Sequence, residues 1–336
     1  MSTAVPDRSQ RASKTSLSQR SNPAASEVGD SLLANTSCLL CGQNQLHVVR
    51  RIPTSRLVCE WQSTFQIDIR SELSELEEIV RLRCDACDFD FFAPGDLTGS
   101  GLFYEALQRF DWYYMPNKWE HQASLPLVEA NHRVLEVGCA EGSFLKRVLG
   151  KRQTTAVGLE LNQHAVQVAQ QAGLDVRAQM IEDFARSTEA PFDIVCAFQV
   201  LEHVPHPLPF LQSCLEVTKP GGYVVLGVPN EDSFLQHEWT LLNMPPHHVS
   251  LWKGSTFERL ASTLPISIES IRREPLAPYH IDQYLAAYAG YFRKKSPLHR
   301  LLFSRTLRKI YRSALHAGWH RRMTGQSLLV VLRKDD

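Results

Sequence analysis

From residue 131 onward, the chain repeats one pattern several times: a short apolar run is followed by a turn and then by a segment with helical spacing of its apolar residues. Apolar runs of five to seven residues are typical of buried strands, and the segments between them have helical spacing. Strands that alternate with helices pair in parallel through right-handed crossovers. This pattern predicts an α/β fold with a doubly wound, mostly parallel sheet. The predicted strands are 133–137, 155–159, 176–178, 192–198 and 223–228, with helices at 143–149, 162–172 and 207–217.

The flanking segments have different patterns. The first 34 residues are rich in Ser, Arg and Ala with few large apolar side chains, so we expect a disordered tail. Further along, 101–130 is rich in aromatic residues at helical spacing, and we expect it to pack a small module onto the core, with Tyr113 and Tyr114 as candidates for a lid over a pocket. The predicted organisation is tail 1–34, small β module 35–100 with strands at 46–52 and 79–83, aromatic helical linker 101–130, core 131–273, helical insertion 274–322 with helices at 281–293 and 298–317, and last strand with C-terminus 323–336.

Charge is balanced overall but unevenly distributed. The chain has 36 Lys+Arg and 36 Asp+Glu, yet residues 293–322 contain ten Lys or Arg and no acidic residue. The basic helix at 298–317 is interpreted as a solvated face, or as a surface that attracts an anionic acceptor, anionic lipid headgroups or RNA. No run of 18 apolar residues and no apolar leader segment occurs, so we expect no transmembrane span, no secretory signal and a cytoplasmic location.

Four of the eight cysteines form two pairs with metal-ligand spacing, Cys38 with Cys41 and Cys84 with Cys87. Two thiolates three residues apart on a tight turn supply two corners of a tetrahedral site, and two such turns complete it. The pattern predicts a zinc-ribbon-like module with a structural zinc ion. Unmetallated thiols in a small β module are the alternative. A redox pair is disfavoured because neither pair lies at a strand-to-helix junction.

A glycine-containing turn, Gly138-Cys139-Ala140-Glu141-Gly142, directly follows the first core strand. In a doubly wound sheet, ligands bind at the carboxyl ends of the strands beside such a turn. Glu160, at the tip of the second strand, is placed to accept hydrogen bonds from two ribose hydroxyls. The turn lacks the G-x-G-x-x-G spacing, which disfavours a dinucleotide. Glu136, within the first strand, repels phosphate and suits a ligand with a cationic amino group.

The central stretch resembles the class I S-adenosylmethionine (AdoMet)-dependent methyltransferases. VLEVGCAEGSFL is similar to their first motif, GLELN to the acidic end of their second strand, FDIVCAFQVLEHV to the motif of their fourth strand and KPGGYVVLGVPN to their fifth strand. The resemblance covers 131–230 and implies a seven-stranded sheet with a reversed last strand, for which 266–272 and 327–332 fit strands six and seven. Ala140 departs from the family, which usually has glycine there.

The resemblance also implies AdoMet contacts, position by position. The turn residues Gly138, Cys139, Ala140 and Gly142 pass under the methionine moiety, Glu136 faces its amino group and Glu160 binds the ribose. Met180 and Ile181 flank the adenine, and Phe198 and Gln199 lie near the sulfonium. Core packing is the alternative for each apolar residue.

Three histidines are candidates for the chemistry. His203 follows the fourth strand, and His247 and His248 follow Pro245-Pro246, whose fixed φ and missing donors stiffen the loop. We expect one of the loop pair to face the acceptor as a base or hydrogen-bond partner and the other to brace the loop. Packing against Trp252 is the alternative. QVLEH is similar to the E-x-x-E-H segment of metal-assisted quinone methyltransferases, but Gln199 replaces the first acid and disfavours a divalent cation there.

The whole layout is similar to methyltransferases of sugar and surface-glycan biosynthesis. The first hypothesis is therefore methyl transfer from AdoMet to a sugar-type or other small hydroxylated acceptor, for which a phosphorylated or nucleotide-linked form is one option. The second is an RNA methyltransferase that holds nucleic acid with the module and the basic helix. No NPPY-like tetrapeptide occurs and the module is not conspicuously basic, which disfavours nucleic acid. The third is a non-enzymatic scaffold that binds the cofactor, against which the intact motifs argue.

Overall fold

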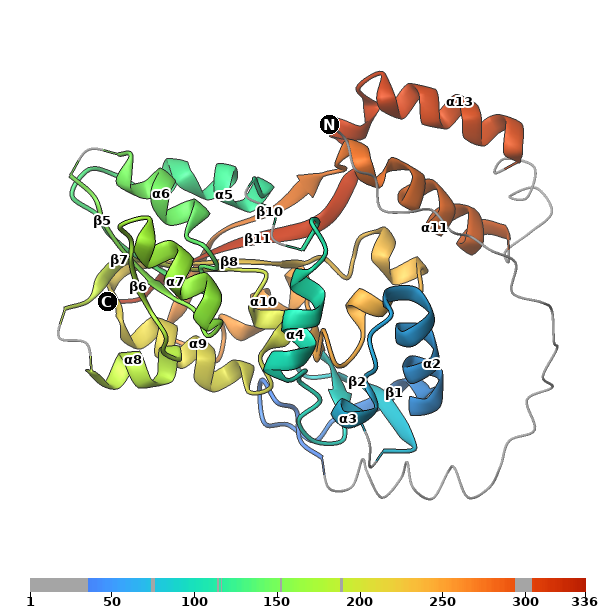
Figure 1. Ribbon diagram of the computed structural model, residues 1–336, viewed down its shortest axis with the longest axis horizontal. Coiled ribbons are helices and arrows are strands. Elements are labelled where there is room, and N and C mark those ends of the chain that lie inside the picture. The colour runs from blue at the N-terminus through green and yellow to red at the C-terminus, as the bar shows by residue number, and fades with distance from the viewer. Residues whose placement is uncertain are drawn as a thin grey trace.

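The computed structural model describes residues 36–336 except 74–75, 114, 116, 152, 188–189 and 294–303. It contains a seven-stranded sheet, a four-stranded sheet and the helices around them (Figure 1). The predicted tail and the lid candidate Tyr114 lie outside the described residues.

The seven-stranded sheet forms the core and has the predicted topology. Its order is β10-β11-β8-β7-β4-β5-β6, and the pairs from β8 to β6 are parallel. β11 is antiparallel to both β8 and β10, which confirms the reversed last strand. The strands are β4 (Arg133–Val137), β5 (Thr155–Leu159), β6 (Asp175–Arg177), β7 (Phe192–Phe198), β8 (Thr218–Pro229), β10 (Ile266–Pro275) and β11 (Thr324–Lys334).

Helices cover both faces of this sheet, as the continuous apolar runs of its strands require. Neighbouring strand residues point to opposite faces, so Val134 and Leu135 belong to two separate core clusters. One cluster packs against α8 (Ile181–Ser187), α9 (Pro207–Glu216) and α10 (Gly254–Leu260). The other packs against α5 (Trp119–Ser124), α6 (Ser143–Leu149) and α7 (Gln163–Gln171).

The N-terminal module has its own antiparallel sheet, and the core segment contributes one strand to it. β1 (Leu46–Pro53), β2 (Glu78–Cys84) and β3 (Asp90–Ala93) contain the strands predicted at 46–52 and 79–83. Between β1 and β2 lie α2 (Thr54–Phe65) and α3 (Arg70–Leu73). β9 (Ser250–Leu251), from the segment assigned to the core, pairs with β3. The loop that carries His247 and His248 is therefore fastened to the module.

A buried ion network joins the same two parts. The side chain of Asp90 is fully buried, and Arg83 Nε donates to its Oδ1 at 2.6 Å, while Lys253 Nζ lies 3.3 Å from that oxygen. Arg81 pairs with Asp90 and also donates to Glu231 at 2.8 Å. Lys253 and Glu231 come from the core segment, so these ion pairs cross from module to core.

The helical elements outside the core differ in part from the prediction. The linker forms α4 (Gly101–Gln108), and the insertion forms α11 (Ile281–Arg293) and α13 (Arg305–His316). The helix predicted over 298–317 begins only at Arg305, because Ser304 is its N-cap, with Oγ accepting from Leu307 N; residues 298–303 lie outside the described part. Short 3-10 turns are η1 (Leu125–Leu127), η2 (Leu201–His203), η3 (Phe234–His237), η4 (Leu241–Asn243), η5 (Pro278–His280) and η6 (Trp319–Arg322).

Helices α11 and α13 pack against each other and lie beyond the sheet, on the side away from α6 and α7 (Figure 1). Within the described residues, none of the helices combines the length and the apolar character that crossing a membrane requires.

Candidate functional site

The turn after β4 lies against the end of β5. The backbone N–H groups of Gly138 and Cys139 both donate to Leu159 O, at 2.8 and 3.0 Å. Gly138 and Gly142 have φ of 72° and 76°, which favour glycine. A Cβ at Gly138 would lie 2.4 Å from Val200 Cγ2, and one at Gly142 would lie 2.2 Å from Leu174 Cδ1. Both positions therefore favour glycine by conformation, and at Gly138 the neighbouring Val200 also leaves little space for a side chain.

Glu160 holds this turn in place. Its Oε2 accepts from Ala140 N at 2.9 Å and its Oε1 accepts from Asn162 N at 2.8 Å. An ionised carboxylate offers about four lone-pair sites, so two remain for hydroxyl donors such as those of a ribose. Ala140 itself has φ of 47°, a left-handed conformation that glycine adopts with less strain.

Glu136 is a buried carboxyl group beside the turn. It is 3% exposed, and its Oε2 has no hydrogen-bond partner among the described residues. Burial raises its pKa to about 8, although the positive charge of Lys118 acts in the opposite direction. An unpaired buried carboxylate is costly, and a cationic ligand group placed against it would remove that cost. The turn, Glu160 and Glu136 therefore fit a ligand with a ribose and an ammonium group.

The other predicted cofactor residues have different environments. Cys139 is buried, and burial raises the pKa of its thiol. Phe198 is buried against the rings of His121 and Phe144. Met180 is 52% exposed, whereas Ile181 is 2% exposed within the hydrophobic core. Of the apolar pair, only Met180 has a surface free for a ligand.

The side chain of Gln199 contacts Glu120, a residue that the sequence analysis did not consider. Gln199 has φ of 59°, and its Nε2 donates to Oε1 of the buried Glu120 at 2.7 Å. Gly227 passes close to the same carboxylate, because a Cβ there would lie 3.0 Å from Glu120 Cγ. Glu120 thus lies at the carboxyl end of β7, beside β8. The short sequence WEHQ around Glu120 contains no motif or spacing that would have predicted this position.

The structure brings His203, His247 and His248 together. The ring centroids of His247 and His248 are 4.4 Å apart, and each lies within 4.8 Å of that of His203. Their Nδ1 atoms face oxygen acceptors: His203 faces His247 O at 2.6 Å, His247 faces Leu242 O at 2.8 Å, and His248 faces Asn243 Oδ1 at 2.9 Å. A carbonyl oxygen only accepts, so each Nδ1 carries the proton and each Nε2 keeps a lone pair.

Burial controls the charge of this cluster. It lowers the pKa of His247 to about 4 and holds the pKa values of His203 and His248 well below the usual one, so the three imidazoles are neutral at pH 7. Glu202 Oε1 lies 4.0 Å from His203 Nε2. Both carboxylate oxygens of Glu202 are buried without a hydrogen-bond partner among the described residues, and burial raises its pKa to about 8.

Aromatic side chains of the module and linker enclose the histidine loop. The rings of Trp61, Phe103 and Tyr113 lie 6.5, 6.3 and 5.9 Å from that of His247. His247 and His248 are each 7% exposed, whereas the side chain of His203 is 20% exposed. The loop pair is therefore largely braced, and His203 is the most accessible of the three. Trp252, the alternative packing partner, instead stacks on Phe257 and contacts Phe89.

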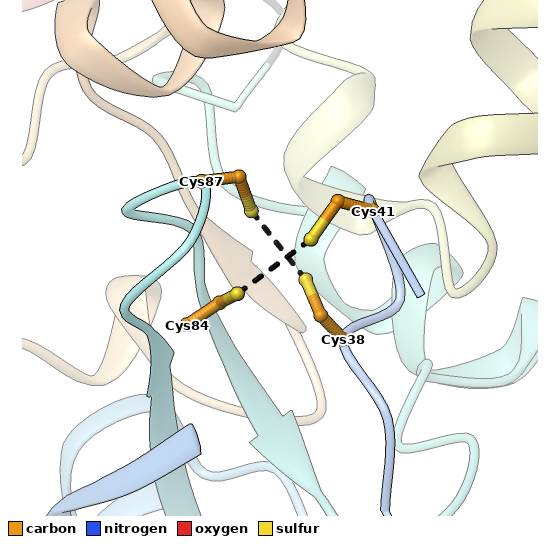
Figure 2. Close-up of side chains that lie close together, drawn as sticks. All are labelled: Cys38, Cys41, Cys84 and Cys87. Atoms are coloured by element: carbon orange, nitrogen blue, oxygen red, sulfur yellow. Dashed lines mark hydrogen bonds between the residues drawn. The ribbon is translucent and has the colours of Figure 1, made fainter. Parts of the chain in front are cut away.

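The four predicted metal ligands converge on one point (Figure 2). Cys38 Sγ lies 3.5 Å from Cys87 Sγ, and Cys41 Sγ lies 3.6 Å from Cys84 Sγ. Four thiolates around an ion at about 2.3 Å are separated by about 3.8 Å, so this spacing fits a tetrahedral zinc site. Gly42 and Asp88 follow the second cysteine of each pair with φ of 72° and 56°, so the two turns match.

A cavity of about 200 Å³ lies where the module meets the core. The predicted cofactor residues do not line this cavity, and neither do His203, His247 and His248. We therefore do not assign it to the site described above. It is lined by Thr36, Leu39, Phe91, Phe92, Ala93, Pro94, Gly95, Asp96, Pro205 and His206.

The basic helix α13 is amphipathic, and its apolar side is only partly covered. Leu315 is buried, whereas Ile310 and Tyr311 are 58% and 37% exposed. Arg312 pairs with Asp282 of α11 at 2.7 Å, which ties the two helices of the insertion together.

The topology and the glycine turn define the core as a class I methyltransferase fold, and residues 111–264 match the family model described as a methyltransferase domain. Among curated proteins, the chain is 33% identical over 106 residues to a ubiquinone biosynthesis O-methyltransferase of Vibrio parahaemolyticus, covering 30% of this chain and 45% of the relative. The protein of that name from Pseudomonas entomophila is 34% identical over 109 residues, covering 31% of this chain and 47% of the relative.

The chain thus spans about half the length of the curated relatives that it matches. Among solved structures, a SAM-dependent methyltransferase from Archaeoglobus fulgidus aligns with a TM-score of 0.46 and 17% identity, over 69% of this chain and 100% of that chain.

Proposed function

We propose that this protein is an AdoMet-dependent methyltransferase that methylates a hydroxyl group of a small acceptor. The observation that carries the proposal is the joint geometry of the 138–142 turn, Glu160 and Glu136 at the carboxyl ends of β4 and β5. These groups match the ribose and the ammonium of AdoMet. The match of 111–264 to a methyltransferase domain supports it independently.

AdoMet supplies an electrophilic methyl group on a sulfonium that is already a good leaving group. The acceptor oxygen forms a bond to the methyl carbon, the carbon–sulfur bond breaks, and S-adenosylhomocysteine leaves. The hydroxyl proton must also be removed, and the protein aligns donor with acceptor and excludes water. Glu160 would hold the ribose, Glu136 the ammonium, and Gly138, Cys139 and Gly142 the methionine chain.

The histidine cluster activates the acceptor in this proposal. His203 lies just past the end of β7, and Val200 of the same loop contacts Gly138 of the turn. The free Nε2 of His203, the most exposed of the three, faces the acceptor, and the neighbouring imidazoles hold it in place.

We propose two classes of acceptor for the methyl group. A sugar-type acceptor, phosphorylated or nucleotide-linked, is the first, and the basic surface around Arg308, Lys309 and Arg312 would favour its anionic group. A phenolic hydroxyl is the second, favoured by the name of the curated relatives. Nucleic acid is not proposed as a substrate, and a cytoplasmic location is proposed for both classes.

The N-terminal cysteines have a structural role in this proposal. Four thiolates leave no open coordination position, so a zinc ion at Cys38, Cys41, Cys84 and Cys87 would stabilise the module and carry out no chemistry. The module then supports the histidine loop through β9 and through Trp61.

The test is transfer of an isotopically labelled methyl group from AdoMet into a fractionated cell extract, with identification of the labelled product. We expect a small product with a new methyl ether. The Glu160→Ala protein should transfer little label and serves as the matched control. Label found in RNA, or in nothing, would contradict the proposal.

A further inference from the structure

The three clustered histidines have a feature that base catalysis by a single imidazole does not require. Each Nδ1 is fixed to an oxygen of the chain, so each of the three rings keeps its free lone pair on Nε2. One ring nitrogen from each residue lies within 4.8 Å of the other two. Histidines that bind metals in proteins usually donate their second N–H to a carbonyl or carboxylate in this way, which sets the tautomer and the ring orientation.

Two unpaired polar groups lie at the same place. The Nε2 of His247 is buried without a hydrogen-bond partner among the described residues. Both oxygens of the buried Glu202 also lack a partner, and Oε1 lies 4.0 Å from His203 Nε2. A buried acceptor and a buried carboxylate left without partners are costly. A cation between them would bind the lone pair and offset the carboxylate charge.

We propose that His203, His247 and His248 form a binding site for a divalent transition-metal ion of the zinc class, separate from the cysteine site. Imidazole nitrogen suits Zn²⁺ or Co²⁺, and hard cations such as Mg²⁺ prefer oxygen. These ligands differ from the E-x-x-E-H pattern, because the loop after β8 supplies two of them and Gln199 takes no part.

The geometry requires a small closure on binding. Nitrogens around one ion at about 2.0–2.1 Å are separated by about 3.4 Å in a tetrahedral site. The ring nitrogens of the cluster lie within 4.8 Å of one another, so they must approach each other by up to about 1.4 Å on binding. Three protein ligands leave a fourth position open for water or substrate. This inference rests on the proposed function in one respect: with the ion bound, His203 Nε2 would act on the acceptor through the ion and not as a free base. An acceptor hydroxyl in the open position would then lose its proton to water more readily, because a bound cation lowers the pKa of a coordinated hydroxyl.

The experiment counts ions in the full chain, purified with zinc in its cysteine site, after dialysis against excess Co²⁺ and removal of the free ion. The wild type should retain one more ion per chain than the cysteine site holds, with visible absorption typical of nitrogen and oxygen ligands. His203→Gln keeps a donor for His247 O and should lose the added ion, as should His247→Ala. His206→Ala is the matched control, because His206 is exposed and outside the cluster, and it should bind as the wild type does.

Circular dichroism and the zinc content of the cysteine site show whether each variant is folded. Failure of the folded wild type to retain added Co²⁺, or equal retention by folded His203→Gln, overturns the metal site. The readout does not involve methyl transfer. Methyl transfer by a folded wild type that retains no added Co²⁺ would leave the proposed function standing and the metal site refuted. Retention of Co²⁺ by a protein that transfers no methyl group would leave the metal site standing and the proposed function refuted.

Discussion

At the scale of single residues, the account depends on backbone conformation and on unpaired charge around the 138–142 turn. The sequence analysis grouped Glu160 with the glycines of this turn, and the structure brings these residues together. It gave no signal for Glu120, because a lone acid in a helical segment has no spacing to interpret. Ile181 shows the opposite problem, since an apolar residue after a strand has the same pattern whether it packs in the core or against an adenine.

Ala140 is expected to be a strained position. Replacing it with glycine should raise the free energy of unfolding by up to about 1 kcal/mol, because glycine adopts a φ of 47° without a clash from Cβ. Ala172 has φ of −80° at the end of α7, so Ala172→Gly should destabilise and serves as the control. Denaturant unfolding measures both, and a loss of stability in Ala140→Gly would refute the strain.

Glu136 is expected to make stability depend on pH. Its pKa is raised to about 8 in the folded state from 4.5, so the folded chain binds an extra proton between these values. The stabilising contribution is fully present below about pH 4.5 and is lost as the pH rises through about 8, by up to about 1.4 kcal/mol per pH unit.

Glu136→Gln should remove this part of the slope. Denaturant unfolding without ligand, from pH 5 to 9, gives the comparison. Glu202, also raised to about 8, keeps its own contribution in the variant, so the slope should fall and not vanish. Parallel pH profiles for wild type and variant would show that Glu136 is not perturbed.

At the scale of elements, local signals predicted most of the core and little of how the module is attached. The central strands β4 and β7 were predictable because each is a mainly apolar run between turn residues, and β11 was recognisable from the length of its apolar stretch. β9 was not, because two residues after a Pro-Pro-His-His sequence carry no periodicity. The start of α13 was misplaced because apolar spacing continues upstream of its Ser304 cap.

The ion network at Asp90 is expected to be the strongest single link between module and core. Asp90→Asn removes the fully buried charge that Arg81, Arg83 and Lys253 share, although Arg81 keeps Glu231 and Lys253 keeps Asp88. It should lower the free energy of unfolding by about 3 kcal/mol, the lower end of the range for breaking a buried ion pair. Asp175→Asn breaks an exposed pair with Arg177 and should change stability little. Equal effects of the two substitutions in denaturant unfolding would show that the network contributes nothing special.

At the scale of the whole molecule, the N-terminal module with its four clustered cysteines, a methyltransferase core and a helical insertion are joined around one loop. His247 and His248 lie where β9, α2 and η2 meet, so the module contributes to the geometry of the histidine cluster. The loop that follows Pro245-Pro246 leaves the core segment and pairs with the module through β9, a connection that the sequence pattern did not indicate.

Loss of the cysteine site is therefore expected to affect the core as well as the module. Cys84→Ser should lose the bound zinc and lower the melting temperature of the entire chain, because β9 and the Asp90 network transmit the loss. Cys59 is exposed and outside the cluster, so Cys59→Ser is the matched control. Metal analysis with calorimetric melting tests this, and a core transition that stays at its original temperature would separate the two parts.

The central claim is that the 138–142 turn and Glu160 bind AdoMet, and calorimetric titration of the purified chain with AdoMet tests it most directly. Glu141→Ala removes an exposed acid of the same turn and is the control, while Glu160→Gln keeps one acceptor for Ala140 N and guards against a misfolded turn. The account predicts saturable binding at one site per chain, retained by Glu141→Ala and weakened at least about tenfold in Glu160→Ala, because hydrogen bonds to a charged group are lost. Absence of binding to the wild type, or equal affinity in Glu160→Ala, would contradict it.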